Sequence, residues 1–194
     1  MALNEDEIRS QAWQNVVHAE GTRAVFARRV SKFRRQTQFR DALGLMVPAT
    51  LAFVYGTDWL QQYPTIRTVA LYTLSVLTLV QFLISAWSIL TRWDDESSYS
   101  LRAMRDANSM RDMWRRIGLG DVSNFRTSYD LASEMQRVID SHDVQRNVSD
   151  SERRFGMRAG LLFVPKKCAI CGELPKSSRV PWWPSTRCTN CGGN

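Results

Sequence analysis

The four cysteines are the residues of this 194-residue sequence with the clearest capacity for chemistry. Cys168 and Cys171 form one CxxC motif, and Cys188 and Cys191 form a second one after 16 intervening residues. Each motif can present two thiolates to one ion, and four sulfur ligands complete a tetrahedral zinc site. Because a closed site leaves no position for water, we expect one structural Zn²⁺ per chain. Paired disulfides and an iron–sulfur cluster are the alternatives that the spacing leaves open.

The segment between the two motifs, residues 172–187, contains three prolines and the adjacent pair Trp182 and Trp183. This composition predicts a small zinc ribbon with a β-hairpin over residues 161–194, and not a finger that contains a helix. Two neighbouring tryptophans in so small a module cannot both be buried. We therefore predict that Trp182 or Trp183 contacts a partner or a membrane surface.

Residues typical of catalysis do not form a pattern elsewhere. His18 and His142 are the only histidines, and the sequence contains no GxSxG, Walker or HExxH motif. We therefore expect a protein that is not an enzyme and that has no small-molecule substrate.

Two apolar stretches determine the predicted fold class. Residues 68–90 comprise 23 residues without a charge, which as a helix span about 34 Å, slightly more than the bilayer hydrocarbon core. Residues 42–57 comprise 16 residues, and Phe39 and Trp59 can mark the interfacial ends of this stretch. We predict a mostly α-helical membrane protein with a transmembrane hairpin over 42–90, whose spans are about 42–59 and 68–90. A buried soluble hairpin is the alternative, and it is weaker for the second stretch.

The positive charges predict the orientation of this hairpin. Residues 23–40 carry seven basic residues and no acidic one, whereas the loop between the spans carries one base, Arg67. The positive-inside rule then places both termini in the cytoplasm. The net charge of +7 suits an anionic membrane surface. Contact with anionic lipid or another ligand is predicted for Arg28, Arg29, Lys32, Arg34 and Arg35, with nucleic acid, a phosphorylated signal or a solvated helix face as alternatives.

Helices are expected on both sides of the hairpin. Residues 1–41 are predicted to form a cytoplasmic amphipathic and basic helix, with Asn4 and Glu7 at its start. Residues 91–160 are predicted to form further cytoplasmic helices. The first of these ends near Gly118 and Gly120, and a later one begins where Thr127 precedes Asp130.

Polar residues recur every three or four positions along the second span. They are Ser75, Thr78, Gln81, Ser85 and Ser88. Such a stripe can line a pore in an assembly of several chains, or it can mediate close helix packing. In the first span Gly44 and Pro48 are a candidate hinge, because Pro48 removes a backbone hydrogen bond.

With these features in place, the chain resembles the SLATT-type two-transmembrane proteins of bacteria. Within them it is similar to the mobilome-associated group that ends in paired CxxC motifs. The resemblance covers residues 5–145 and includes a helix that opens with Trp93 and carries Tyr99, Leu101, Ala107 and Asn108. The paired motifs are more specific, although their separation of 16 residues is longer than is usual in that group.

This resemblance implies a homo-oligomeric effector that permeabilises the bacterial inner membrane in a conflict or anti-phage defence system. It also implies a trigger from a partner, such as a second-messenger synthase, a nucleotide sensor or a reverse transcriptase. The alternative is a membrane-anchored zinc-ribbon adaptor that recruits a protein or nucleic acid without forming a pore.

Overall fold

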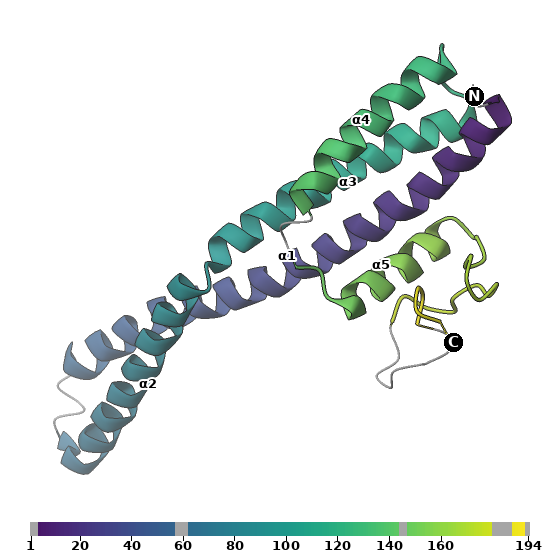
Figure 1. The fold of residues 1–194 in the computed structure, drawn as a ribbon. Helices are drawn as coiled ribbons and strands as arrows, with labels where there is room; N and C mark the ends of the chain where they lie inside the picture. Colours follow the sequence, from purple (N-terminus) through teal and green to yellow (C-terminus); the bar gives the residue numbers. More distant parts are fainter. Residues whose placement is uncertain (1–3, 57–61, 144–146, 180–187, 193–194) are drawn as a thin grey trace. The chain divides into compact units, whose positions relative to one another are not determined.

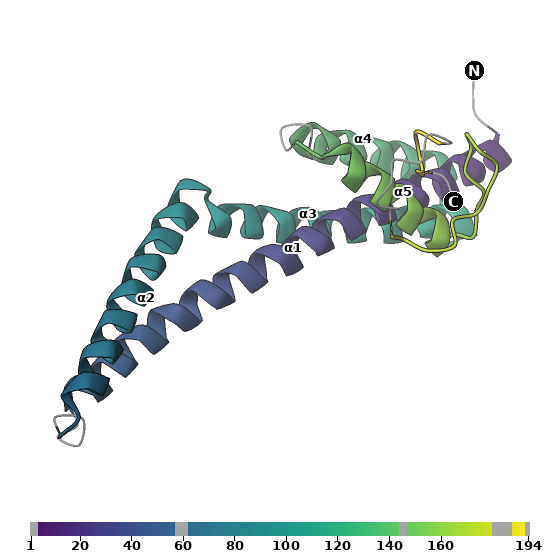
Figure 2. The ribbon, with the colours of Figure 1, turned by 90° about the horizontal axis from the view of Figure 1, so that it is seen from below.

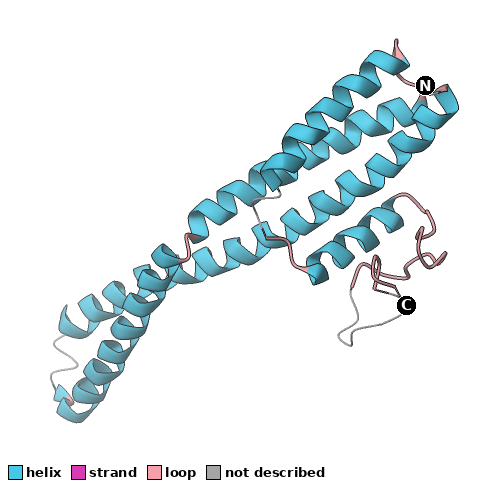
Figure 3. Ribbon diagram, in the orientation of Figure 1, coloured by secondary structure: helices cyan, strands magenta, loops and turns pink. Residues whose placement is uncertain are grey.

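Five helices account for most of the chain in a computed structural model, which describes residues 4–56, 62–143, 147–179 and 188–192 (Figure 1). In chain order they are α1 (Glu5–Gly56), α2 (Pro64–Leu90), α3 (Trp93–Leu119), α4 (Phe125–Asp143) and α5 (Asp150–Phe163). No strand forms among the described residues (Figure 3). The mostly α-helical prediction is therefore confirmed.

The chain divides into two compact units. One unit contains Met1–Arg29 and Tyr99–Asn194, and the other contains Val30–Ser98. We refer to them as the bundle unit and the hairpin unit. The single helix α1 contributes its first part to the bundle unit and its second part to the hairpin unit.

Polar side chains fix the starts of three helices. At α1 the backbone N–H of Asn4 donates to Glu7, as the sequence predicts. Helix α5 begins with a complete capping box between Ser149 and Glu152. The predicted start of α4 at Thr127 is wrong, because the side chain of Asn124 accepts from the Thr127 backbone N–H at 3.1 Å and the helix begins two residues earlier.

The core of the bundle unit lies between α1, α3 and α4, which run side by side in Figures 1 and 2. Its fully buried residues are Ile8, Ala12, Val16, Ala19, Met110, Trp114, Ile117 and Ala132. Trp114 packs edge-on against Tyr129 of α4, with ring centroids 5.5 Å apart, and its Nε1 donates to Gln136 Oε1. The indole therefore fills the core and still satisfies its only donor.

One buried carboxylate joins α1 to α3. Glu20 is only 4% exposed. It accepts hydrogen bonds from Arg23 on its own helix, at 2.8 Å, and from Arg111 on α3, at 3.1 Å. A buried carboxylate needs such partners, because its desolvation would otherwise destabilise the fold.

The hairpin unit is an antiparallel pair formed by α2 and the second part of α1. Near one end of the pair, Arg40 of α1 donates to the buried hydroxyl of Ser88 at 2.8 Å and to Asp94 at 3.2 Å. Further along, Gly44 of α1 lies opposite the amide of Gln81. Helix α1 continues through Pro48 to Gly56, so the proposed hinge at Gly44 and Pro48 stays a prediction.

The predicted β-hairpin between the cysteine motifs is not present in the described part of residues 161–194. Residues 172–179 form bends and extended loop without ladder pairing, and residues 180–187 lie outside the described residues. Pro175, which is buried, has no N–H for a ladder. This segment is held by side chains and turns instead of strands.

Candidate metal centre and membrane hairpin

Both cysteine motifs fold into the same tight turn. The N–H of Gly172 donates to the carbonyl of Cys168 at 2.8 Å, and the N–H of Gly192 donates to the carbonyl of Cys188 at 3.0 Å. Both glycines have φ near +75°, at 73° and 77°, where a side chain would be strained. The motif that forms each turn is therefore CxxCG, and the chain contains two copies of it. The glycines were not singled out in the sequence, although the repeated letter after each second cysteine would have revealed them.

The two turns bring all four sulfur atoms into one cluster. The Sγ atoms of Cys168, Cys171, Cys188 and Cys191 lie within 4.8 Å of one another. Across the two turns, Cys168 Sγ lies 3.8 Å from Cys188 Sγ, and Cys171 Sγ lies 3.5 Å from Cys191 Sγ. These separations exceed a disulfide bond of about 2 Å and match the roughly 3.8 Å edge of a tetrahedron with metal–sulfur bonds of about 2.3 Å. The cluster can therefore hold a metal ion.

The surroundings of the sulfurs affect how readily they lose protons. Burial acts to raise the pKa of the Cys188 thiol, but backbone N–H groups of Cys191 and Asn190 and the neighbouring thiols outweigh it and lower the pKa to about 6. At Cys171 the backbone N–H of Glu173 acts to lower the pKa, but burial and the thiols of Cys168 and Cys188 raise it. One thiolate is thus available near neutral pH to begin metal binding.

Helix α5 anchors the cysteine cluster. The cluster packs with Val17 of α1 and Leu161 of α5 in a small apolar core. Arg158 of α5 is 3% exposed. It donates to the carbonyls of Ser177, at 2.7 Å, and Cys191, at 3.1 Å. This arginine connects the second cysteine motif to the segment that follows the first one, and nothing in its local sequence indicated that role.

Helix α5 in turn contacts α1 backbone to backbone. A Cβ on Gly21 would lie 2.7 Å from the carbonyl oxygen of Gly156, and a Cβ on Gly160 would collide with the carbonyl oxygen of Val17. Glycine at these positions permits the close approach. At the start of α5, Glu152 accepts from Arg29 at 2.7 Å. This bond, with those from the Ser149 N–H and hydroxyl, lowers the Glu152 pKa to about 2 against the opposing effect of burial.

Two members of the predicted lipid-contact set have partners within the bundle unit. Arg29 pairs with Glu152 and also donates to the carbonyl of Asn147. Arg28 lies over the ring of Phe155, 5.0 Å from its centroid. Both arginines thus help to dock α5 on α1. Lys32, Arg34 and Arg35 belong to the hairpin unit and are exposed, and their contact with anionic lipid stays a prediction.

The structure divides the predicted polar stripe of α2 into two parts. Ser88 is buried, and Gln81 and Ser85 are half-buried on the side of α2 that faces α1. Ser75 and Thr78 are exposed, and their hydroxyls donate to the carbonyls of Leu71 and Leu74 in their own helix. Within one chain, the C-terminal part of the stripe, from Gln81 to Ser88, is therefore used in helix packing.

Most of the exposed side chains of α2 are apolar. The exposed large side chains of α2 are Ile66, Val69, Tyr72, Val76, Leu77, Leu79, Val80, Phe82, Leu83, Trp87, Ile89 and Leu90. Among the described residues, α2 is the one helix that is long and apolar enough to cross a membrane. This supports a membrane association. The corresponding part of α1 exposes Leu45, Met46 and Phe53, and the predicted end of the first span at 57–59 lies outside the described residues, as do Trp182 and Trp183.

The fold and the cysteine cluster define a helical protein with a C-terminal cluster of four cysteines that can hold a metal ion. The family described as "Mobilome CxxCx(11)CxxC protein" matches residues 9–194. The chain belongs to this family, although 16 residues separate its two motifs in place of the 11 in the family description. No curated protein and no solved structure matches the chain.

Proposed function

We propose that the chain is a two-pass protein of the bacterial inner membrane, with α2 and residues 42–59 as its spans and both termini in the cytoplasm. The carrying observation is the apolar exterior of the hairpin unit, to which both helices contribute. Leu45, Met46 and Phe53 of α1 are each at least 59% exposed, as is most of the apolar surface of α2. Each such side chain left in water would forgo about 1.5–3 kcal/mol of burial, whereas lipid accommodates them all.

Within this membrane protein, the family's mobilome description and the resemblance to SLATT-type proteins support a role in bacterial conflict. The chain acts as a homo-oligomeric effector that permeabilises the inner membrane, for example in anti-phage defence, and it performs no enzymatic reaction. Because two helices cannot enclose a channel, several hairpins must assemble. A partner such as a second-messenger synthase, a nucleotide sensor or a reverse transcriptase supplies the trigger.

Zinc is the metal that best suits the cysteine cluster. Four thiolate ligands at tetrahedral separations favour Zn²⁺, and they leave no open position for substrate or water. Cys168, Cys171, Cys188 and Cys191 would hold this structural ion. Its contribution is the folding of the two cysteine turns onto α5.

Membrane potential in cells tests the effector proposal. Triggered induction of the wild-type chain should depolarise the inner membrane. Gln81→Leu should abolish this effect without reducing membrane insertion, because the only amide on the inner side of α2 is lost. Thr73→Leu is the matched control, because Thr73 is exposed and bonds only its own helix in the described contacts. Equal depolarisation by all three chains would exclude Gln81 from the pore.

The second candidate function is that of a membrane-anchored adaptor, which recruits a partner without forming a pore, and one observation favours it. In a single chain Gln81 lies against Gly44 and Ser88 binds Arg40, so the polar side of α2 is occupied without an assembly. A membrane-inserted wild type that never depolarises the cell on triggering would select the adaptor and refute the effector.

A further inference from the structure

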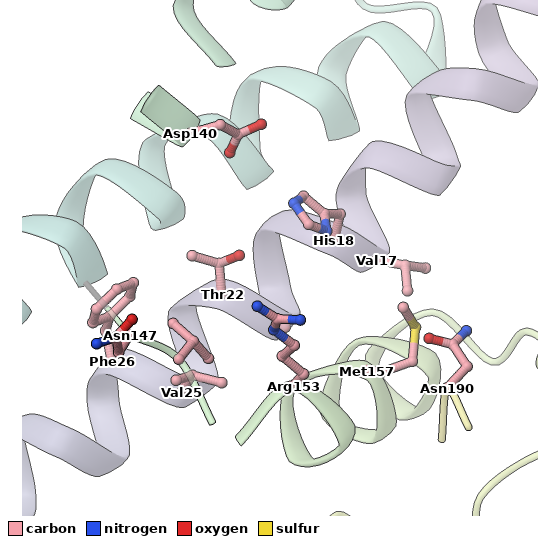
Figure 4. A pocket seen from close by; sticks show the side chains of 13 residues that line it. Val17, His18, Thr22, Val25, Phe26, Asp140, Asn147, Arg153, Met157 and Asn190 are labelled. Atoms are coloured by element: carbon pink, nitrogen blue, oxygen red, sulfur yellow. The ribbon is translucent and has the colours of Figure 1, made fainter. Parts of the chain in front are cut away.

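A cavity of about 500 Å³ lies in the bundle unit among α1, α4, α5 and the second cysteine turn (Figure 4). Its lining comes from distant parts of the sequence: residues 17–26 of α1, Asp140 of α4, residues 147–157 and Asn190. The fold assembles these parts through the α1–α5 glycine contact and the cysteine cluster. Its volume is in the range of pockets that bind small molecules.

One part of the wall is apolar. Val17, Val25 and Phe26 contribute from α1, and Met157 contributes from α5. Phe26 is held in place by an edge-on contact with Tyr99, with ring centroids 5.9 Å apart. This wall is fixed and suits the apolar body of a ligand.

Polar groups that can bind an anion lie around the centre of the cavity. Figure 4 shows the ends of His18, Thr22 and Arg153 around its middle, with Asp140 beyond them. Arg153 is not used by the fold: its side chain is 72% exposed and its carboxylate partner, Asp150, lies 3.9 Å away. Asp140 accepts from Gln136 Nε2 at 2.7 Å, so this carboxylate is held on the α4 side of the cavity.

We propose that this cavity binds a small organic anion, in which a phosphate monoester or carboxylate is attached to a flat apolar body. Arg153 binds the anionic group through its planar set of donors. The Thr22 hydroxyl and the His18 imidazole add hydrogen bonds, and the body of the ligand packs against Phe26, Val25 and Met157.

The position of Asn190 connects this site to the metal centre. Asn190 lies between Cys188 and Cys191 and lines the cavity. Its side-chain nitrogen also lies 3.9 Å from Cys168 Sγ. A ligand in the cavity therefore contacts a turn that carries two of the four metal ligands. The site lies wholly within the bundle unit, so the inference stands independently of the membrane proposal.

Calorimetric titration of the full chain in nanodiscs of zwitterionic lipid tests the proposal. The probes are phenyl phosphate and phenylacetate, which present the two anionic groups on one apolar body, and inorganic phosphate, which has no apolar body. We expect phenyl phosphate or phenylacetate to bind, and inorganic phosphate to bind at least tenfold more weakly. The tighter of the two ring-bearing probes identifies the class of anion.

Two variants locate the binding. Arg153→Gln should weaken it about tenfold or more, because a charge-assisted contact is lost, and the near-isosteric Thr22→Val should weaken it by a smaller factor. Arg137→Gln is the matched control, since Arg137 is 76% exposed on α4 and pairs only with Glu134 in the described contacts. The proposal is overturned if neither ring-bearing probe binds at millimolar concentration, or if Arg153→Gln binds as well as Arg137→Gln.

Discussion

At the scale of residues, the guanidinium of Arg158 links the cysteine cluster to the helices. It is buried and donates to two carbonyls, that of Ser177 in the segment after the first cysteine motif and that of Cys191 in the second motif. Those carbonyls have no strand partner in the described residues, so the arginine satisfies backbone groups that a β-ribbon would pair within itself. The metal centre is therefore integrated with α5 through side-chain contacts.

Loss of one metal ligand is the first prediction at this scale. The wild type should contain one equivalent of zinc per chain, and Cys171→Ser should contain less than half of one. Metal analysis checks both values, and hydrogen exchange should show loss of protection from residue 164 onward while α2 stays protected. Thr189→Ser, an exposed change within the second turn, should retain the metal. Iron in the wild type would contradict the zinc assignment.

The Arg29–Glu152 pair makes the docking of α5 sensitive to acid. The Glu152 pKa falls from its ordinary value of 4.5 to about 2, chiefly through the hydrogen bond from Arg29. Since the folded pKa is the lower one, the stabilisation is complete above pH 4.5 and is lost as the pH falls toward 2. Glu152→Gln should weaken α5 protection at neutral pH and flatten its dependence on pH across that window.

Hydrogen exchange of residues 150–163, corrected for the intrinsic exchange rate, measures this effect. Glu134→Gln removes a carboxylate from an exposed pair on α4 and should keep the pH dependence of the wild type. If Glu152→Gln and the wild type lose protection in parallel as the pH falls, another group controls the docking of α5.

Local sequence accounts for the metal ligands but not for their supports. The spacing of Cys168, Cys171, Cys188 and Cys191 identifies a ligand set because each pair acts within one turn. Arg158 acts on carbonyls 19 and 33 residues away, and no local pattern encodes such a distance. The glycine that follows each motif could have been recognised from the sequence as part of the turn, because it occurs at the same position after both motifs.

At the scale of elements, local sequence predicts where the helices form but not how they pack. Apolar spacing predicts that residues 101–117 form a helix, and α3 buries Ala103, Ala107, Met110, Trp114 and Ile117 along one side. The polar stripe of α2 was predicted as one surface. Its orientation depends on which side α1 covers, and that pairing places Gln81 and Ser88 inside and Ser75 outside. The periodicity of polar and apolar residues shows which side chains share one face of a helix, but it does not show which other helix packs against that face.

The close glycine contact between α1 and α5 predicts how a substitution at Gly160 affects the packing of these two helices. An alanine in a helix normally stabilises it by about 0.5–1 kcal/mol relative to glycine. In Gly160→Ala the new methyl group would meet the backbone of Val17, and this overpacking should cost about 1–3 kcal/mol. We therefore expect destabilisation in spite of the better helix former.

Hydrogen exchange over α5 compared with α3 reports this change, and metal retention is a second measurement. Gly56→Ala is the matched control, because it makes the same change in a helix at a position where a Cβ would meet nothing within 4 Å. Equal protection of α5 in Gly160→Ala and in the wild type would show that the helices separate to accommodate the methyl group at no cost.

At the scale of the whole molecule, the sequence predicted two spans and the described structure contains one helix that meets the length and hydropathy of a span. The difference concerns α1, where the apolar residues after Asp41 continue a helix that carries many charged side chains from Glu5 to Asp41. The second part of α1 pairs with α2 and exposes large apolar side chains. The number of membrane spans therefore depends on whether the second part of α1 crosses the bilayer, and labelling on both sides of it tests this.

Three introduced cysteines determine the topology. Gln38→Cys, Gln62→Cys and Ser151→Cys all replace exposed residues, which lie before the first apolar stretch, between the stretches and on α5. With two spans and cytoplasmic termini, an impermeant thiol reagent added to intact cells should label position 62 alone. Peptide mapping separates each introduced thiol from the four native ones, and permeabilised cells give the control for reactivity at all three positions.

Labelling of the cysteine at position 38 distinguishes a topology with one membrane span from a topology with two. If α2 alone crossed the bilayer, positions 38 and 62 would lie on the same side and would both react in intact cells, whereas position 151 would not. If α1 also crosses, position 38 is protected, because the basic residues around it are held on the cytoplasmic side. Labelling of position 151 without position 62 would reverse the orientation and would contradict the positive-inside prediction for this chain.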